Sequence, residues 1–271
     1  MEADGFTVVK KSKKSKKFSN FSNKSLKVKL EEKTDNIDFK FFNYSLEFLK
    51  EQIEYWEEKG YFKNGSEVDI ICYGIGSPSD SINAQYQLSY IYKLRNALNV
   101  KGKFEVFDPV EQSKEDLEIY SDWGFEIIPH NEEAKRSIDN TPTIFYMPHC
   151  PKLLYNNVLG ANWNLSKLDK IVVIGNRFEL YDDLNLDKSL KEICPYLYNC
   201  LDLVKIDIFP PFAYDETVFN DTSFHRFQTK LNPKLLEFEF KPLLSAVISS
   251  DEEVIKSKEE LEEKLDNLEI E

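Results

Sequence analysis

A short apolar segment followed by two glycines and a helix start is the feature that most restricts the fold of this chain. Residues 68–73 have the composition of a buried β-strand and lead into Gly74-Ile75-Gly76. Ser77 is a good helix N-cap and Pro78 suits the first helical position, so a long helix is expected to begin there. A strand, a glycine turn and a capped helix form the first unit of an α/β sheet.

The same alternation of strands and helices continues along the chain. A helix is expected over residues 113–123, closed by Gly124. Because the order β-α-β-α favours parallel strands with helices on both faces, the sequence predicts an α/β fold with a Rossmann-like, mostly parallel sheet flanked by helices. Further strands are expected at residues 104–108, 125–128, 143–147, 170–174 and 204–208.

The segments outside this alternation carry weaker patterns. Apolar residues recur at helical spacing from Phe41 to Trp56, and Gly60 supplies a stop, which predicts a helix before the first strand. After Pro210-Pro211 the periodicity fades. Residues 212–240 are expected to form an extended arm with one strand at 236–240, and residues 252–268 to form a marginal helix or an acidic tail.

The two ends of the chain carry opposite charge. Residues 1–33 hold ten Lys against four acidic residues, and residues 251–271 hold ten acidic residues against three Lys. The expected organisation is a basic disordered tail over 1–38, a Rossmann-like domain over 39–245 and an acidic tail or marginal helix over 246–271. Since the net charge is −13 and the middle of the chain is itself acidic, the core is not expected to bind nucleic acid.

The basic segment at residues 10–17 contains six Lys and has two interpretations. It is either a solubilising tail or a segment read by nuclear-import receptors or acidic partners, which recognise short basic clusters electrostatically.

The four cysteines contain no C-x-x-C pair, and the N-terminus lacks the apolar stretch of a secretory signal, which favours a reducing compartment. Cys194 and Cys200 lie in an apolar helical stretch and are interpreted as buried thiols. No apolar run approaches the length of a membrane span, so a soluble protein without a membrane partner is expected.

The loop after the first strand is the strongest candidate for ligand binding. Gly74 and Gly76 permit close backbone approach to a ligand, and amides near Ser77 at a helix start favour an anion. The dinucleotide fingerprint has a third glycine where this chain has Ser79. Asp108 ends the second strand and is placed to accept from a ribose. The alternative is that the glycines and Asp108 only form tight turns.

His149 follows another predicted strand and therefore lies at the same sheet edge, as a pocket or acid–base residue or as a hydrogen-bonded turn residue. Neighbouring residues on an extended segment point to opposite faces, so His149 and Cys150 are not expected to pair for nucleophilic catalysis. His149, Cys150 and His225 lack the close ligand pairs of structural zinc sites, and no metal is expected.

Several motifs together resemble one known family, the sensitivity-to-red-light-reduced family, over roughly residues 40–225. The opening Asp4-Gly5-Phe6-Thr7-Val8-Val9 and the run 219–225 also look like that family. The resemblance rests on Tyr73-Gly74-Ile75-Gly76-Ser77, Phe107-Asp108-Pro109, Phe145-Tyr146-Met147-Pro148-His149-Cys150-Pro151, Leu154-Tyr155-Asn156-Asn157, Asn162-Trp163 and Ile174-Gly175-Asn176.

The resemblance implies a eukaryotic protein of nucleus and cytoplasm, linked to light input into the circadian clock, to clock-gene expression and to haem biosynthesis. It brings no catalytic residues and no defined cofactor. Two hypotheses therefore stand: a non-catalytic regulator whose core is a protein-interaction platform gated by a small nucleotide-like ligand, or a methyltransferase-like enzyme using the Gly74–Gly76 loop and an adenosyl cofactor.

Overall fold

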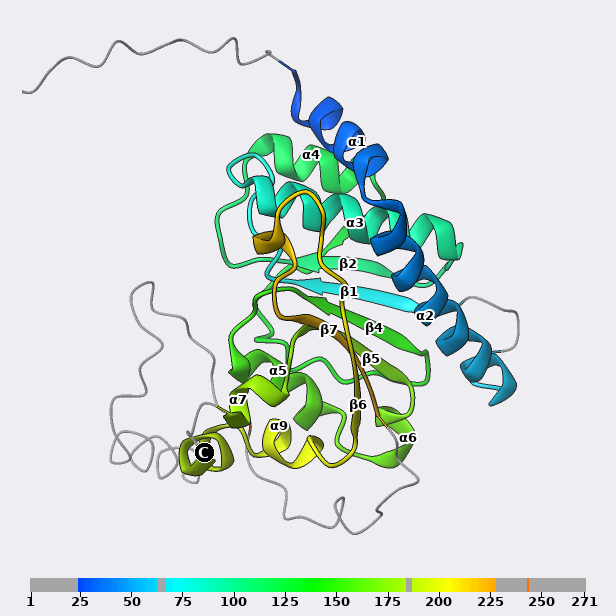
Figure 1. The fold of residues 1–271 in the computed structure, drawn as a ribbon, viewed down its shortest axis with the longest axis vertical. Helices are drawn as coiled ribbons and strands as arrows, with labels where there is room; N and C mark the ends of the chain where they lie inside the picture. Colours follow the sequence, from blue (N-terminus) through cyan, green and yellow to red (C-terminus); the bar gives the residue numbers. More distant parts are fainter. Residues whose placement is uncertain (1–23, 63–66, 184–186, 228–242, 244–271) are drawn as a thin grey trace, which may run out of the picture.

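The computed structural model describes residues 24–62, 67–183, 187–227 and 243 (Figure 1). Its centre is a seven-stranded sheet with the order β3-β2-β1-β4-β5-β7-β6. The strands are β1 Asp69–Tyr73, β2 Phe104–Phe107, β3 Glu126–Ile127, β4 Thr143–Met147, β5 Ile171–Asn176, β6 Val204–Ile208 and β7 Thr222–Phe227.

The first five strands in chain order pair in parallel, and β7 is antiparallel to both β5 and β6. The predicted α/β fold with a mostly parallel sheet is therefore confirmed. Strands β4 and β6 have the predicted bounds, and the other predicted strands are displaced by at most two residues at either end. The carboxyl ends of β1, β2, β4 and β5 consequently meet at one edge.

Strand β7 differs from the expectation for this part of the chain. The sequence predicts an extended arm over residues 212–240, whereas Thr222–Phe227 is a strand inserted between β5 and β6. The strand is buried almost throughout although it contains Thr222, Ser223 and His225, so it lacks the apolar pattern that marks a core strand. The predicted strand at 236–240 and the helix at 252–268 lie outside the described residues.

Helices cover both faces of the sheet. Figure 1 shows α1 to α4 gathered on one side and α5, α7 and α9 on the other. The described helices are α1 Leu26–Asn36, α2 Phe39–Glu58, α3 Ile82–Leu98, α4 Lys114–Asp122, α5 Lys152–Ala161, α6 Leu165–Leu168, α7 Glu179–Asp183, α8 Asp187–Ile193, α9 Pro195–Cys200 and the 3₁₀ turn η1 Glu216–Val218.

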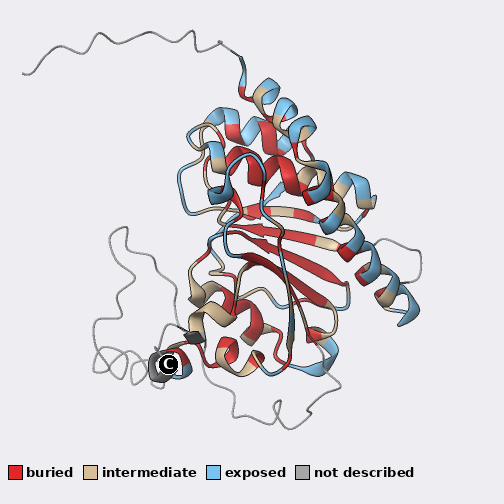
Figure 2. Cartoon of the chain, viewed as in Figure 1, coloured by how far each residue is buried: buried red, intermediate tan, exposed pale blue. Residues whose placement is uncertain are grey.

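Two hydrophobic cores result, one on each face of the sheet (Figure 2). Successive residues of a strand point to opposite faces. Ile70 of β1 therefore packs with α2 and α3, whereas its neighbour Ile71 packs with α5 and α9. Burial on both faces explains why the central strands are almost continuously apolar.

Helix α1 corrects the expected extent of the basic tail, because residues 26–36 were assigned to disordered chain. Leu26 and Leu30 are buried, and the Leu30 carbonyl accepts a 3.1 Å hydrogen bond from the Ser89 hydroxyl of α3. Two leucines in a charged segment give a weak signal in sequence. Their burial depends on α3, which only the tertiary structure supplies.

Helix α3 begins four residues later than expected. Ser81, not Ser77, is its N-cap and accepts from the Ala84 amide. The Ser77 carbonyl instead accepts from the amides of Asp80 and Ser81 in a turn. Both serines have features of a cap, and local sequence does not distinguish them.

Residues 209–221 connect β6 to β7 and are called the strap here. In Figure 1 the strap rises from the sheet to η1, which contacts α3. Phe209, Phe212 and Phe219 of the strap pack around Phe41 of α2, with ring centroids 4.9 to 5.4 Å from it. This aromatic cluster fixes the strap over the face covered by α2 and α3.

Candidate functional site

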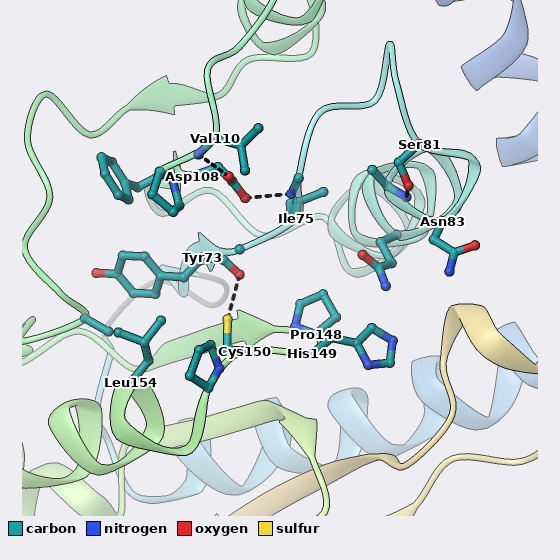
Figure 3. A pocket seen from close by; sticks show the side chains of 18 of the residues that line it. Tyr73, Ile75, Ser81, Asn83, Asp108, Val110, Pro148, His149, Cys150 and Leu154 are labelled. Atoms are coloured by element: carbon teal, nitrogen blue, oxygen red, sulfur yellow. Dashed lines mark hydrogen bonds between the residues drawn. The ribbon is translucent and has the colours of Figure 1, made fainter. Parts of the chain in front are cut away.

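A cavity of about 330 Å³ lies at the carboxyl ends of β1, β2 and β4 (Figure 3). Gly74 and Gly76 line it from the loop after β1, Asp108 from the end of β2, and His149 from the end of β4. The structure thus brings together four of the five residues that the sequence analysis proposed for ligand binding. Ser77 is the exception, because it is buried and is not among the lining residues.

A glycine is required at position 74 for two reasons, its backbone conformation and the close approach of a side chain from the turn after β4. Its φ is +69°, in the region that L side chains rarely adopt, and its amide donates to the Phe107 carbonyl at 3.2 Å. A Cβ at this position would lie 2.6 Å from the Cys150 sulfur. The glycine therefore allows the loop after β1 and the turn after β4 to touch.

Asp108 ties this glycine loop to β2. Its Oδ2 accepts from the Gly76 amide at 2.6 Å, and its Oδ1 accepts from the Val110 amide at 2.8 Å. Burial raises the pKa of Asp108, while these two hydrogen bonds act in the opposite direction. Each carboxylate oxygen keeps a further lone pair, so Asp108 is still able to accept from a ligand.

Ser77 and Ser79 turn toward α4 instead of the cavity. The Ser77 hydroxyl donates to Asp116 at 2.8 Å, and the Ser79 amide donates to the same carboxylate at 2.8 Å. Burial alone would raise the pKa of Asp116, but hydrogen bonds, first those from Ser77 and Ser113, outweigh it and lower the pKa. Asp116 therefore anchors the second half of the loop to the N-terminus of α4.

His149 lies in a tight turn with φ +55°. Its backbone amide donates to Asn176 Oδ1 at 2.9 Å, and its Nε2 lies 3.1 Å from the carbonyl oxygen of Val218 in η1. Because a carbonyl oxygen only accepts, Nε2 is the donor in this hydrogen bond. His149 thus links the cavity to the strap.

Asn176 and Tyr155 hold the His149 turn in place. Neither residue is assigned a site role by the sequence pattern. Asn176 also donates from Nδ2 to the Cys150 carbonyl at 3.2 Å. The Tyr155 hydroxyl donates to the Met147 carbonyl at 2.6 Å and accepts from the Asn176 amide at 2.9 Å. The available signal was an amide side chain at the end of the buried apolar strand β5, at the edge where β1, β2 and β4 end.

Cys150 is buried and does not face His149. Its sulfur donates to the Tyr73 carbonyl at 3.4 Å, and the two side chains point apart in Figure 3. Burial, and secondarily the charge of Asp108, raise the pKa of the thiol. A thiol held in the neutral form is a poor nucleophile.

His225 lies in β7 and is fully buried. Its Nδ1 is 3.0 Å from the Val173 carbonyl, its Nε2 accepts from the Phe178 amide at 3.4 Å, and its ring stacks on Phe178 at 3.7 Å. Burial lowers the pKa of His225 to about 3. Both ring nitrogens are therefore engaged within the core. Among the described residues no group of three or more His, Cys, Asp and Glu is arranged to hold a metal ion.

Comparison with known proteins adds a family. A family model described as the SRR1 domain matches residues 47–226. The SRR1-like protein of Mus musculus is 33% identical over 142 residues, which cover 52% of this chain and 57% of the relative. Protein SENSITIVITY TO RED LIGHT REDUCED 1 of Arabidopsis thaliana is 36% identical over 119 residues, which cover 44% of this chain and 42% of the relative.

An SRR1-like protein of Drosophila melanogaster is 27% identical over 168 residues, which cover 60% of this chain and 56% of the relative. The chain spans about half the length of these curated relatives. No solved structure matches it. None of the helices in the described part of the chain is both long and apolar enough to cross a lipid bilayer.

Proposed function

The chain belongs to the SRR1 domain family, and on that premise we propose that it is a regulator in a light- or clock-responsive pathway whose Rossmann-like core binds a small ligand. The name of the Arabidopsis relative, which refers to sensitivity to red light, supports the pathway. A link to haem biosynthesis, and a location in nucleus and cytoplasm, stay predictions from the family resemblance.

The observation that carries the ligand-binding proposal is the cavity at the carboxyl ends of β1, β2 and β4. Open α/β sheets bind ligands at this edge. A volume of about 330 Å³ falls within the range of small-molecule sites. The turns that form the cavity follow several different strands, and hydrogen bonds hold these turns in place, as expected of a preorganised site.

The strap supplies a route from this cavity to a partner protein. The Val218 carbonyl accepts from Gln87 Nε2 at 2.9 Å and bonds His149 Nε2 at 3.1 Å, and both side chains line the cavity. A ligand that moves either side chain changes the support of the strap. Tyr214 at the tip of the strap is 60% exposed and is available to a partner.

Filling the cavity tests ligand binding. Ala84 lines the cavity from α3 and is buried, whereas Ala97 on the same helix is exposed and does not line it. Native mass spectrometry of the purified full chain is expected to show a co-purifying mass of a few hundred daltons, retained by Ala97→Leu and lost in a folded Ala84→Leu variant. Equal occupancy in both variants, or no bound mass in the wild type together with no binding in a screen of adenosine compounds, contradicts the proposal.

A second candidate is a methyltransferase-like enzyme, and the strand order favours it specifically. The order 3-2-1-4-5-7-6 is the dinucleotide-binding order 3-2-1-4-5-6 with one antiparallel strand inserted before the last position. Enzymes that transfer methyl groups from S-adenosylmethionine commonly have this insertion, although a fold alone does not establish a reaction. If the purified protein forms S-adenosylhomocysteine, the enzyme candidate is supported. If the protein binds S-adenosylmethionine but shows no turnover of it in cell extract, the regulator is supported.

A further inference from the structure

The charge around the cavity restricts which ligand fits it. Two acidic residues, Asp108 and Glu133, line it, and none of the described lining residues is Lys or Arg. The nearest cation in sequence, Lys135, is paired with Glu133 at 2.7 Å. An anionic ligand here meets the Asp108 carboxylate, and the charge of Lys135 is already neutralised by Glu133, so its binding costs Coulomb energy in a partly buried site.

Three backbone amides of the loop are already engaged within the protein and do not compensate for this charge. The Gly74 amide donates to Phe107, the Gly76 amide to Asp108 and the Ser79 amide to Asp116. Phosphate sites in this fold depend on free amides in the glycine loop and at the start of the following helix. Here that helix begins at Ile82, so its first turn, which lines the cavity through Ser81, Asn83 and Ala84, is separated from the glycine loop by the turn at residues 77–81.

Asp108 occupies the position at the end of β2 where an acidic residue accepts hydrogen bonds from a ribose in this fold. Both of its oxygens have a lone pair beyond the bonds to Gly76 and Val110. A nucleoside is therefore matched by hydrogen bonding, and a positive charge on it is matched by the carboxylate of Asp108.

We infer that this cavity binds an adenosine compound that carries a positive charge and no phosphate, an adenosyl sulfonium of the S-adenosylmethionine type, and that it discriminates against nucleotides. The inference rests on the proposed ligand-binding function and specifies its ligand. Asp108 accepts from the ribose and stabilises the positive charge, and Glu133 keeps the charge of the neighbouring Lys135 neutralised.

Titration calorimetry on the full chain tests the inference with three probes. S-adenosylmethionine carries the sulfonium charge, S-adenosylhomocysteine lacks the methyl group and that charge, and ATP carries the phosphates. The expected order of affinity is S-adenosylmethionine, then S-adenosylhomocysteine, then ATP, with at least about tenfold between the first and the last. Tighter binding of ATP than of S-adenosylmethionine overturns the inference and leaves the proposed ligand-binding function standing.

A charge-neutralising pair of variants gives an independent test. Glu133→Gln removes a carboxylate from the cavity, and Glu111→Gln removes an exposed one that does not line it. The preference for S-adenosylmethionine over ATP is expected to fall about threefold or more in Glu133→Gln and to stay unchanged in Glu111→Gln. An equal change in both variants, or none in a folded Glu133→Gln protein, overturns the inference. If folded wild type binds none of the three probes and carries no co-purified ligand, the proposed function itself fails.

Discussion

The carboxylate of Asp108 accepts a 2.6 Å hydrogen bond from the backbone amide of Gly76, so the residue that directly follows β2 also fixes the loop that follows β1. The same carboxylate accepts from the Val110 amide. The structural role and the proposed ligand-binding role of Asp108 therefore depend on one group, and a variant has to be judged on both.

Replacing Asp108 by Asn is expected to weaken ligand binding more than folding. The Asn side chain has one acceptor oxygen and an NH₂ donor, so it serves only one of the two amides, at a cost of about 1–3 kcal/mol in the free energy of unfolding. Urea denaturation measures this cost, and calorimetry with S-adenosylmethionine measures affinity. Unchanged affinity in a folded Asp108→Asn protein contradicts the assignment of Asp108 to the ribose.

Contact between Gly74 and Cys150 is expected to make substitutions at the two positions non-additive. Gly74→Ala places a Cβ 2.6 Å from the Cys150 sulfur at a φ of +69°, with an expected cost of about 2–4 kcal/mol. Cys150→Ala removes that sulfur, so in the double variant part of the cost is recovered, with a coupling of about 0.5–3 kcal/mol.

Gly124 provides the matched control for this cycle. Its φ is +76°, but nothing lies within 4 Å of a Cβ built there. Gly124→Ala is therefore expected to cost only the backbone strain, about 1–2 kcal/mol, and to show no coupling with Cys150→Ala. Chemical denaturation of the single and double variants checks both statements. Full additivity at Gly74 and Cys150 contradicts the close contact.

His225 is expected to make the protein less stable in mild acid. Its pKa is about 3 in the folded state against 6.5 for an ordinary histidine, so below pH 6.5 the unfolded chain binds a proton that the folded chain does not. Its contribution is complete above pH 6.5 and falls by up to about 1.4 kcal/mol per pH unit as the pH decreases toward the folded pKa.

His225→Asn keeps a donor near Nδ1 and removes the titration. Measured by denaturation between pH 6.5 and 5, the loss of stability with acid is expected to be smaller in His225→Asn than in wild type. Exposed His130 supplies a control for the substitution itself, since His130→Asn is expected to leave the free energy of unfolding at pH 7 within about 0.5 kcal/mol of wild type. Equal slopes in wild type and His225→Asn show that His225 does not titrate as described.

The basic segment at residues 10–17 is expected to direct nuclear accumulation. Deletion of residues 1–23 retains Ser25, the N-cap of α1, and is expected to leave the melting temperature within error. The nuclear fraction of a fluorescent fusion in eukaryotic cells is expected to fall on deletion, and to fall equally when only the six Lys of residues 10–17 become Gln. An unchanged distribution supports the solubilising interpretation.

Most of the sheet was predictable because the central parallel strands are short apolar runs bounded by polar or turn residues, as in residues 143–147. Strand β7 was not predicted because Thr222, Ser223 and His225 are polar. Their burial depends on the neighbouring strands and helices. Helix α1 was not predicted because Leu26 and Leu30 are buried only when α3 is in place.

The location of the candidate site was predictable, since strand ends in a parallel sheet meet at one edge and Gly74, Gly76, Asp108 and His149 all follow strands. Their hydrogen-bond partners were not. That Asp108 accepts from the Gly76 amide depends on long-range geometry, which the order of the strands does not determine. The same is true of Ser77, which points to Asp116 of α4.

Hydrogen–deuterium exchange of the full chain, with and without saturating S-adenosylmethionine, tests most directly whether the cavity is a ligand site that communicates with the strap. Protection is expected in the loop at residues 74–77, in the turn at 148–150 and in η1 Glu216–Val218, which the cavity contacts through His149 and Gln87. Unchanged exchange at all three segments contradicts the account, as does protection confined to a surface away from the carboxyl ends of β1, β2 and β4.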